Sequence, residues 1–413
     1  MDGAGRAHSA ILPRRRGEGK SRPRKTDTLA STMGTPRDPR IVVRVLGGAA
    51  AGGAAVGALG VALAAAFARR VVRWRPHDDE RVLAADERMV VLAASLKTRH
   101  PGVFGMRYAD GYALAGPVVA EDARTVTREL REVSGRPPGR GGASWEGDVH
   151  ALPSDVGPHV DVLIDAPSGP APAWRFGPAE NATWAIHIHG IRSTRDGALR
   201  TVPAAEAEGL SSLVVSYRGD GDAAPAPGGA SRLGLDEADD VDAAIGFAVE
   251  RGAERIVLVG WSMGGGIALR LTERSAHRER IAGLVLVGPA TDWRAAIRSG
   301  AAAGGVPLPG AAARIACAAL GHPLLSRLAG MRAPVDLDEL DWTRPGRLAV
   351  PTLVVHSRAD RTVPFDSTER FAAANPGLVE VQEAPAADHS WEYNVAPEWF
   401  TETVRAWLRA HVA

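Results

Sequence analysis

The stretch "RIVLVGWSMGGGIALRLTER", residues 255–274, decides the fold class of this chain. An apolar run stops at Gly260, a lone serine follows at Ser262, and three glycines beginning at Gly264 lead into an Ala/Leu-rich segment. This order predicts a buried strand, a sharp turn and a helix. The five residues GWSMG form the motif G-x-S-x-G in the strand–turn–helix context that a nucleophile elbow requires.

The glycines of this motif have a steric reason. A serine on so sharp a turn sits in a strained backbone conformation, and the residues two before and two after it must lack a Cβ. Gly260 and Gly264 occupy these two positions. A phosphate-binding loop would need a Lys followed by Ser or Thr, which is absent, and a dinucleotide fingerprint would need glycine where Ser262 stands. The remaining alternative is a glycine turn with an inert serine.

From residue 184 onward, apolar strands alternate with helical segments. Continuous apolar strands separated by helices predict a doubly wound, mostly parallel sheet covered on both faces. Residues 76–183 consist of shorter β-prone pieces and turns, and residues 291–345 interrupt the alternation between two strands. We therefore expect one α/β domain over residues 76–413.

A serine nucleophile needs an adjacent base, and a third group must orient that base. In folds with this kind of elbow, the chain order is serine, acid, histidine. His389 lies in the loop "APAADHSWEYN" after the last predicted strand, and we predict it to be the base. His356 ends a buried strand and is expected to pack in the core or to support the site.

Asp360, in "LVVHSRADRTVP", is the predicted acid because it follows a buried strand at its carboxyl end, where open α/β sheets gather their ligands. Asp292, after an earlier strand, is the main alternative. Asp366 is expected to cap the next helix, and Asp388 would point away from its neighbour His389 in an extended loop.

Backbone N–H groups are the expected donors to the oxyanion. We predict these to be the N–H of Met263 and the N–H of Ile191, which follows the strand end "HIHG". In that strand, His187 and His189 share one face, which raises the alternative of a zinc site. No third ligand stands at a suggestive spacing, so we expect no metal.

Charge is distributed unevenly along the 413 residues, whose formal net charge is +1. Residues 1–44 carry eleven Lys/Arg against four Asp/Glu, and the remainder carries 38 basic against 44 acidic residues. The basic character therefore belongs to a tail that we expect to be disordered, and the body has no sign of a nucleic-acid surface. The single cysteine, Cys317, excludes an intrachain disulfide and a Cys-based metal site.

Residues 45–68 contain no charged residue and are long enough to cross a bilayer as a helix. Because the stronger basic excess lies on the N-terminal side, we predict a single-pass anchor with the α/β domain outside the cytoplasm. A cleaved signal peptide, suggested by "AFA" before Arg69, and a soluble Ala-rich helix are the alternatives. Met33 is an alternative start of the chain.

The "HIHG" strand end, the "GWSMGG" elbow, the "HSRADRTVP" loop and the "DHS" loop together resemble the α/β-hydrolase superfamily of serine hydrolases. "YRGDGDAAP" and "GWSMGGGIAL" resemble its prolyl-oligopeptidase-like and esterase-like branch, in particular membrane-anchored actinobacterial members. The resemblance implies Ser262 as nucleophile, Asp360 and His389 as its partners, and no cofactor. The chain lacks the HGGG tract of lipase-type oxyanion loops.

In this superfamily, an insertion such as residues 291–345 forms a helical cap over the site, so we expect a small lid here. Trp261, Trp293 and Trp342 are predicted to line the substrate pocket. The expected function is hydrolysis of a carboxylic ester through an acyl-enzyme. A peptidase or amidase and a non-catalytic binding protein with the same fold are the alternatives, and the sequence leaves the substrate and the oligomeric state open.

Overall fold

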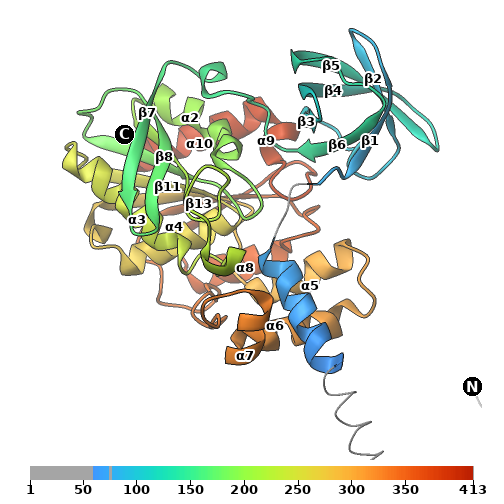
Figure 1. Ribbon diagram of the computed structural model, residues 1–413. Coiled ribbons are helices and arrows are strands. Elements are labelled where there is room, and N and C mark those ends of the chain that lie inside the picture. The colour runs from blue at the N-terminus through green and yellow to red at the C-terminus, as the bar shows by residue number, and fades with distance from the viewer. Residues whose placement is uncertain (1–58, 74–76, 413) are drawn as a thin grey trace, which may run out of the picture. The chain divides into compact units, whose positions relative to one another are not determined.

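The computed structural model describes residues 59–73 and 77–412, and these contain two separate β-sheets (Figure 1). The first is a closed barrel of six antiparallel strands in the order β1-β2-β5-β4-β3-β6. Its strands are β1 (Glu80–Ala85), β2 (Met89–Ala93), β3 (Phe104–Tyr108), β4 (Gly111–Glu121), β5 (Thr125–Gly135) and β6 (Gly141–Glu146).

The barrel differs from the sequence-based expectation, which placed all strands of residues 76–183 in the hydrolase domain as its N-terminal part. The sequence of residues 121–135 fits either a strand or a helix, and this stretch contains β5; residues 135–148, whose glycines and prolines predict a loop, contain β6. The barrel interior holds a fully buried arginine, Arg128, whose guanidinium lies 5.4 Å from the Phe104 ring and 5.3 Å from the Trp145 ring. Closure of the barrel pairs all six strands on both edges, which leaves no exposed edge strand.

The second sheet has eight strands in the order β14-β13-β12-β11-β9-β10-β8-β7. The neighbours from β10 to β14 pair in parallel, and β8 pairs antiparallel with both β10 and β7. This confirms the predicted doubly wound, mostly parallel sheet. The strands are β7 (His159–Ala166), β8 (Gly169–Phe176), β9 (Thr183–Ile188), β10 (Ser211–Val215), β11 (Arg255–Trp261), β12 (Ile281–Val287), β13 (Thr352–His356) and β14 (Val379–Glu383).

Helices cover both faces of this sheet because alternate side chains of each central strand point to opposite faces. On β11, Ile256 and Leu258 belong to the core cluster shared with α3 and α4, while Val257 and Val259 belong to the cluster shared with α2 and α10. All four side chains are buried, so β11 reads as a continuous apolar run. The covering helices are α2 (Val202–Ala207), α3 (Glu237–Glu250), α4 (Met263–Arg274), α8 (Phe365–Ala374) and α10 (Pro397–His411).

Three helices form the insertion between β12 and β13, which the sequence predicted as a cap over residues 291–345. They are α5 (Trp293–Ala303), α6 (Pro309–Gly321) and α7 (Pro323–Ala329). A helix over residues 59–72 joins them, because Ala64, Ala68 and Val72 are buried in the same core cluster as residues of α5 and α6. Its backbone is also held, since Ser231 N donates to Val72 O at 2.9 Å.

The predicted membrane anchor, residues 45–68, is only partly described. Residues 45–58, like the predicted tail 1–44, lie outside the described residues. The described part of the anchor, residues 59–68, uses one face to pack on the protein's own core. Within residues 59–73 and 77–412, no helix has the length and apolar character needed to cross a bilayer. The anchor and the extracytoplasmic location therefore stay predictions.

The junction between β11 and α4 is tightly packed against the carboxyl edge of the sheet. A Cβ at Gly260 would collide with the Gly264 carbonyl, and a Cβ at Gly264 would collide with the carbonyl oxygens of Ile188 and His189 at the end of β9. Two residues later the space opens, because a Cβ at Gly266 would meet nothing closer than Ala290 O at 3.6 Å.

This contrast predicts opposite effects for two identical substitutions on one helix. Gly264→Ala forces α4 away from β9 and is expected to lower the free energy of unfolding by about 1–3 kcal/mol. Gly266→Ala meets only ordinary contact and gains helix propensity, so we expect a change within about 1 kcal/mol, toward greater stability. Urea denaturation followed by circular dichroism measures both. Equal effects of the two variants would contradict the steric account.

Candidate active site

Ser262 is the residue between β11 and α4, and its backbone is strained. Its φ of 51° and ψ of −113° lie in a region that side-chain-bearing residues rarely adopt. The surrounding chain holds it there, since Ser262 N donates to Val287 O at 2.9 Å and Ser262 O accepts from Ala290 N at 3.1 Å. The strained turn places the hydroxyl at the carboxyl edge of the sheet, beside the N-terminus of α4.

The structure brings together the three side chains that the sequence singled out. His389 Nε2 lies 2.8 Å from Ser262 Oγ, and His389 Nδ1 lies 2.6 Å from Asp360 Oδ2. Residues 127 and 29 positions apart in the chain thus form one hydrogen-bonded row. Burial works to lower the pKa of His389, but the Asp360 carboxylate raises it, and the net shift is upward from the ordinary value.

Asp360 is held by four donors. Its Oδ1 accepts from Thr362 N at 2.7 Å and from Val363 N at 2.8 Å, and its Oδ2 accepts from His389 and from His356 Nε2, the latter at 3.0 Å. Burial opposes ionisation of this carboxyl, but the two histidines outweigh it and hold its pKa well below the ordinary range. Asp360 is therefore a fixed carboxylate under His389.

His356 lies at the end of β13. From the sequence, it could either pack in the core or support the site. Its Nδ1 lies 2.8 Å from Thr368 Oγ1 in α8, and its Nε2 faces Asp360. Since a carboxylate only accepts, Nε2 carries the proton and Nδ1 accepts from the threonine hydroxyl. His356 thus ties the Asp360 loop to α8.

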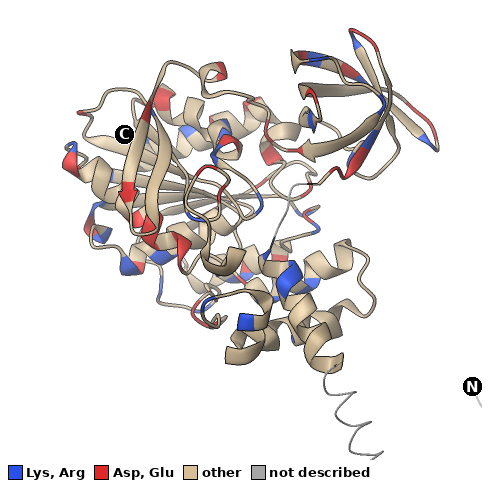
Figure 2. Ribbon diagram, viewed as in Figure 1, with Lys and Arg blue, Asp and Glu red and all other residues tan. Residues whose placement is uncertain are grey.

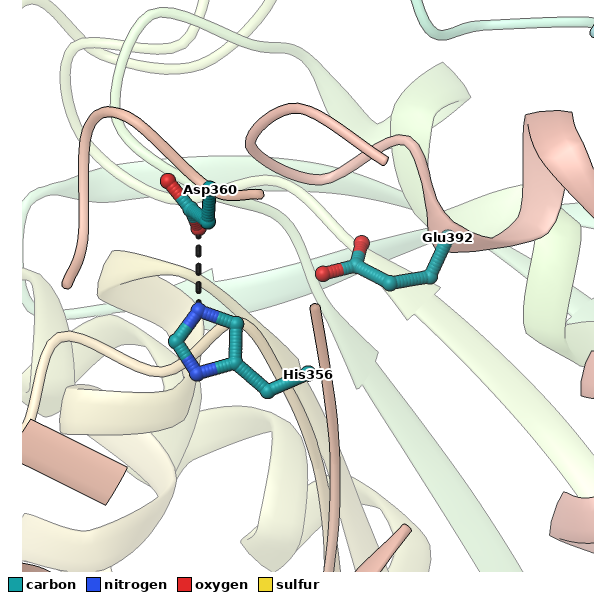
Figure 3. Close-up of side chains that lie close together, drawn as sticks. All are labelled: His356, Asp360 and Glu392. Carbon is teal, nitrogen blue, oxygen red and sulfur yellow. Dashed lines mark hydrogen bonds and ion pairs between the residues drawn. The ribbon is translucent and has the colours of Figure 1, made fainter. Parts of the chain in front are cut away.

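Glu392, the first residue of α9 (Glu392–Val395), is a site residue that the sequence analysis missed (Figure 3). Its side chain is fully buried, and neither carboxylate oxygen has a hydrogen-bond partner among the described residues. Burial raises the pKa of Glu392 to about 7. The only sequence signal was a charged residue three positions after His389, a pattern too common to single it out.

His356, Asp360 and Glu392 offer ligand atoms within 4.8 Å of one another, which is a spacing that a metal ion could use (Figure 3). Both oxygens of Asp360 and both ring nitrogens of His356 already take part in hydrogen bonds. A cation here would have to displace the bonds that hold Asp360 against His389. We therefore treat these three residues as a hydrogen-bonding and electrostatic group.

The predicted oxyanion donors lie beside Ser262. Met263 is the first residue of α4, so its N–H has no acceptor within the helix. Ile191 lines the cavity next to Gly190, and a Cβ at Gly190 would come within 3.1 Å of Ser262 Cβ. Glycine at this position lets the β9 loop approach the serine closely.

A cavity of about 770 Å³ opens over Ser262 and His389. The lining residues from the cap and from the helix at 59–72 are mostly apolar, and we call this side of the cavity its apolar arm. These include Phe67, Val71, Ala296, Ile297, Ala313 and Ala316. The barrel contributes polar residues to the lining, and we call this side the polar arm; they include Lys97, Arg107, Ser144 and Glu146.

Two of the three predicted pocket tryptophans, Trp261 and Trp293, line this cavity. The prediction for Trp342 is wrong. Trp342 is 1% exposed, belongs to the main core cluster, and packs under the Arg347 guanidinium at 3.7 Å from its ring. It anchors the segment after the cap helices.

The alternative site residues have other partners. Asp292 caps α5 by accepting from Ala295 N at 3.0 Å and pairs with Arg370 at 3.0 Å. His187 is fully buried between Thr201 Oγ1 at 2.7 Å and Ser212 Oγ at 3.0 Å, and burial lowers its pKa to about 3. His189 stacks on Tyr217 with ring centroids 4.0 Å apart. His187 and His189 are thus held by separate partners.

Comparison with protein families gives two matches on separate parts of the chain. Residues 181–320 match a family described as serine aminopeptidase, S33, of the α/β-hydrolase type. Residues 81–146, which are the barrel, match a family described as a domain of unknown function (DUF8805). A search among curated proteins found no match.

Among solved structures, the chain is similar to three esterases at low sequence identity. The esterase Pf2001 of Pyrococcus furiosus is 21% identical, with a TM-score of 0.49 over 63% of this chain and 95% of the esterase. A thermophilic esterase of Thermogutta terrifontis is 23% identical, with a TM-score of 0.42 over 61% of this chain and all of the esterase. The esterase RhEst1 of a Rhodococcus species is 21% identical, with a TM-score of 0.44 over 61% and 99% of the two chains. The family match and the sheet order together support an α/β-hydrolase-type fold for the part of the chain that carries the site.

Proposed function

We propose that this protein is a serine hydrolase that cleaves a carboxylic ester. The observation that carries the proposal is the hydrogen-bonded row Ser262–His389–Asp360, in which Ser262 and His389 line a cavity. The match of residues 181–320 to a serine hydrolase family model supports the same reaction class.

In the proposed reaction, Ser262 Oγ attacks the ester carbonyl while His389 Nε2 takes the serine proton. Asp360 accepts a hydrogen bond from the Nδ1–H of His389 and, as a carboxylate, stabilises the imidazolium that forms. The N–H groups of Met263 and Ile191 donate to the oxyanion. His389 then passes the proton to the leaving alcohol oxygen, the C–O bond breaks, and water hydrolyses the acyl-enzyme by the same steps in reverse.

The apolar arm of the cavity fits the acyl part of such an ester. Its lining residues from α5 and α6 are alanine, glycine and isoleucine apart from Trp293, whose indole N–H is the one hydrogen-bonding side-chain group among them. Burial of a methylene group from water stabilises binding by about 0.8 kcal/mol. We therefore propose an aliphatic acyl chain as the occupant of this arm.

A peptidase is the second candidate, and the description of the matched family as serine aminopeptidase supports it. The same three residues serve amide and ester hydrolysis, so substrate comparison has to separate the two. A binding protein without catalytic activity is the third candidate, and the intact hydrogen-bonded row counts against it.

The first prediction of this proposal concerns Ser262. The wild-type protein should react with a fluorophosphonate probe and hydrolyse p-nitrophenyl esters faster than aminoacyl anilides. Ser262→Ala, which lacks the nucleophile, should lose labelling and about 10³-fold or more in kcat/KM. Equal labelling of both proteins would refute the nucleophile assignment. Faster anilide hydrolysis would favour the peptidase, and an unlabelled wild type would favour the binding protein.

The second prediction concerns the acyl arm. Ala313 is 4% exposed and lines the arm, whereas Ala318 lies on the outer face of the same helix. Ala313→Phe should fill the arm and lower kcat/KM for octanoate esters about tenfold relative to acetate esters. Ala318→Phe is the matched control and should leave the octanoate-to-acetate ratio unchanged. The same ratio in both variants would show that acyl chains bind elsewhere.

A further inference from the structure

The barrel β1–β6 is a separate sheet with its own core, and its match to a domain family of unknown function leaves its role open. Two independent contacts connect it with the candidate active site. The barrel forms hydrogen bonds and packing contacts with the loop that carries His389, and it forms one wall of the cavity.

The barrel contacts the histidine loop through a hydrogen bond and through the buried ring of Trp391. Asp388 N donates to His100 Nε2 at 3.1 Å, so the residue before His389 is bonded to the barrel. Trp391, two residues after His389, belongs to the barrel core and packs against Phe104 with ring centroids 4.7 Å apart. The loop is therefore fixed on both sides of His389 by the barrel.

Asn394, in α9 directly after this loop, extends this attachment. Its Nδ2 donates to Val103 O at 2.7 Å and to Gly147 O at 2.8 Å, and its side-chain oxygen accepts from Arg200 Nη1 at 2.9 Å. Gly147 follows β6 directly and also lines the cavity. The position of the cavity wall is thus coupled to that of the histidine loop.

The barrel wall of the cavity is polar and carries both signs of charge. Arg107 Nε donates to Glu146 at 2.8 Å, and Ser144 Oγ donates to the other oxygen of Glu146 at 3.0 Å. Lys97 pairs with Asp79 on the same wall. Figure 2 shows blue and red segments interleaved on the barrel strands, whereas α5 and α6 are mostly tan. Such a wall offers both donors and acceptors, without a strong excess of either charge.

The position of this wall indicates which part of the substrate it meets. In the proposed reaction, His389 protonates the leaving alcohol, so the alcohol must lie on the side of His389. The barrel binds the loop on that side, and the apolar arm lies under the cap. Hydroxyl groups both donate and accept hydrogen bonds, which matches paired carboxylates and guanidinium groups.

We propose that the barrel forms the binding subsite for the leaving alcohol, and that this alcohol carries further hydroxyl groups. The inference rests on the proposed ester hydrolysis and adds the class of substrate: an apolar acyl chain esterified to a small polyol.

Two butyrate esters that differ only in the alcohol test this subsite. Wild-type protein should hydrolyse glyceryl monobutyrate with a kcat/KM about tenfold above that of ethyl butyrate, because only the former reaches the barrel wall with hydroxyl groups. Ser144→Trp should block the polar arm and abolish this preference. Ser134→Trp, on an exposed position of β5, is the matched control and should retain it.

The result that overturns the proposal is equal hydrolysis of the two esters by wild type, or an unchanged preference in Ser144→Trp. If Ser144→Trp fails to fold, Glu146→Gln keeps the shape of the wall, removes its charge, and should raise KM for the glyceryl ester alone. Fluorophosphonate labelling distinguishes failure of the proposed hydrolase activity from failure of the proposed alcohol subsite. Unlabelled wild type refutes the hydrolase itself, whereas labelled protein without a preference refutes only the subsite.

A different observation, the unpartnered Glu392, carries a second inference. We infer that Glu392 is a positioning residue whose charge acts on His389. A Cβ at Gly288 would lie 3.5 Å from Glu392 Oε1 and 3.5 Å from the ring of His389, so both side chains flank one glycine. The other charged or titratable groups facing Glu392 are His356, Asp360 and, from the segment before α2, Arg200.

The sign of this effect follows from the charges. Ionised Glu392 stabilises the imidazolium form of His389 and contributes to the upward shift of its pKa, and the imidazolium in turn favours the ionised form of Glu392, so each charge supports the other. His389 must be neutral to accept the serine proton, so the rate of hydrolysis rises with pH through the pKa of His389. Removal of the Glu392 charge should therefore move this rise to lower pH.

Glu392→Gln tests the inference with little change in shape. The acidic limb of its pH profile for kcat/KM should move down by roughly half a unit or more. Glu398→Gln, at an exposed position of α10, should give the wild-type profile. A profile that coincides with wild type, or a uniform loss of rate without a shift, would refute the inference. If Glu392→Gln fails to fold, Glu392→Met should show the same shift of the acidic limb.

Discussion

The architecture of the site depends on one steric constraint, the close approach of the β11–α4 turn to the end of β9. Backbone carbonyls of Ile188 and His189 occupy the space that a side chain at Gly264 would need. Because the two segments can touch only through glycine, the serine between them is forced to a positive φ. The same approach brings Gly190 against Ser262, so one packing contact positions both the hydroxyl and the neighbouring backbone N–H groups.

Near this turn, the carboxylate of Asp360 fixes the orientation of the charged and polar side chains. Asp360 accepts four hydrogen bonds, which satisfies a charge that burial would otherwise make costly. Two of these donors are histidines from different parts of the chain, so the carboxylate aligns His389 and also joins β13 to α8 through His356. Glu392 differs, because its buried oxygens have no such donors among the described residues. Its pKa is accordingly raised, whereas that of Asp360 is lowered.

Sequence reasoning reached the parts of the structure that leave a local signature. The parallel sheet follows from continuous apolar strands, and the proximity of Ser262, Asp360 and His389 follows from their places at strand ends and in loops. It missed features that depend on distant pairing. Closure of the barrel pairs β1 with β6, which are separated by more than fifty residues. The sequence of neither strand indicates that it pairs with the other. Trp342 was misplaced because a tryptophan in an inserted segment serves a pocket or a core equally well, and packing decides.

In the proposed function, the sheet, the cap and the barrel have different roles, which explains why the chain contains more than the sheet and its helices. The sheet supplies the reacting groups, but its carboxyl edge alone would leave them open to water. The cap and the helix at 59–72 line one arm with mostly apolar side chains, and the barrel lines the other arm with paired charges. Because the barrel also holds the loop of His389, displacement of the barrel would move the base as well as the wall. Binding of the alcohol and alignment of the proposed base are therefore coupled through the same contacts.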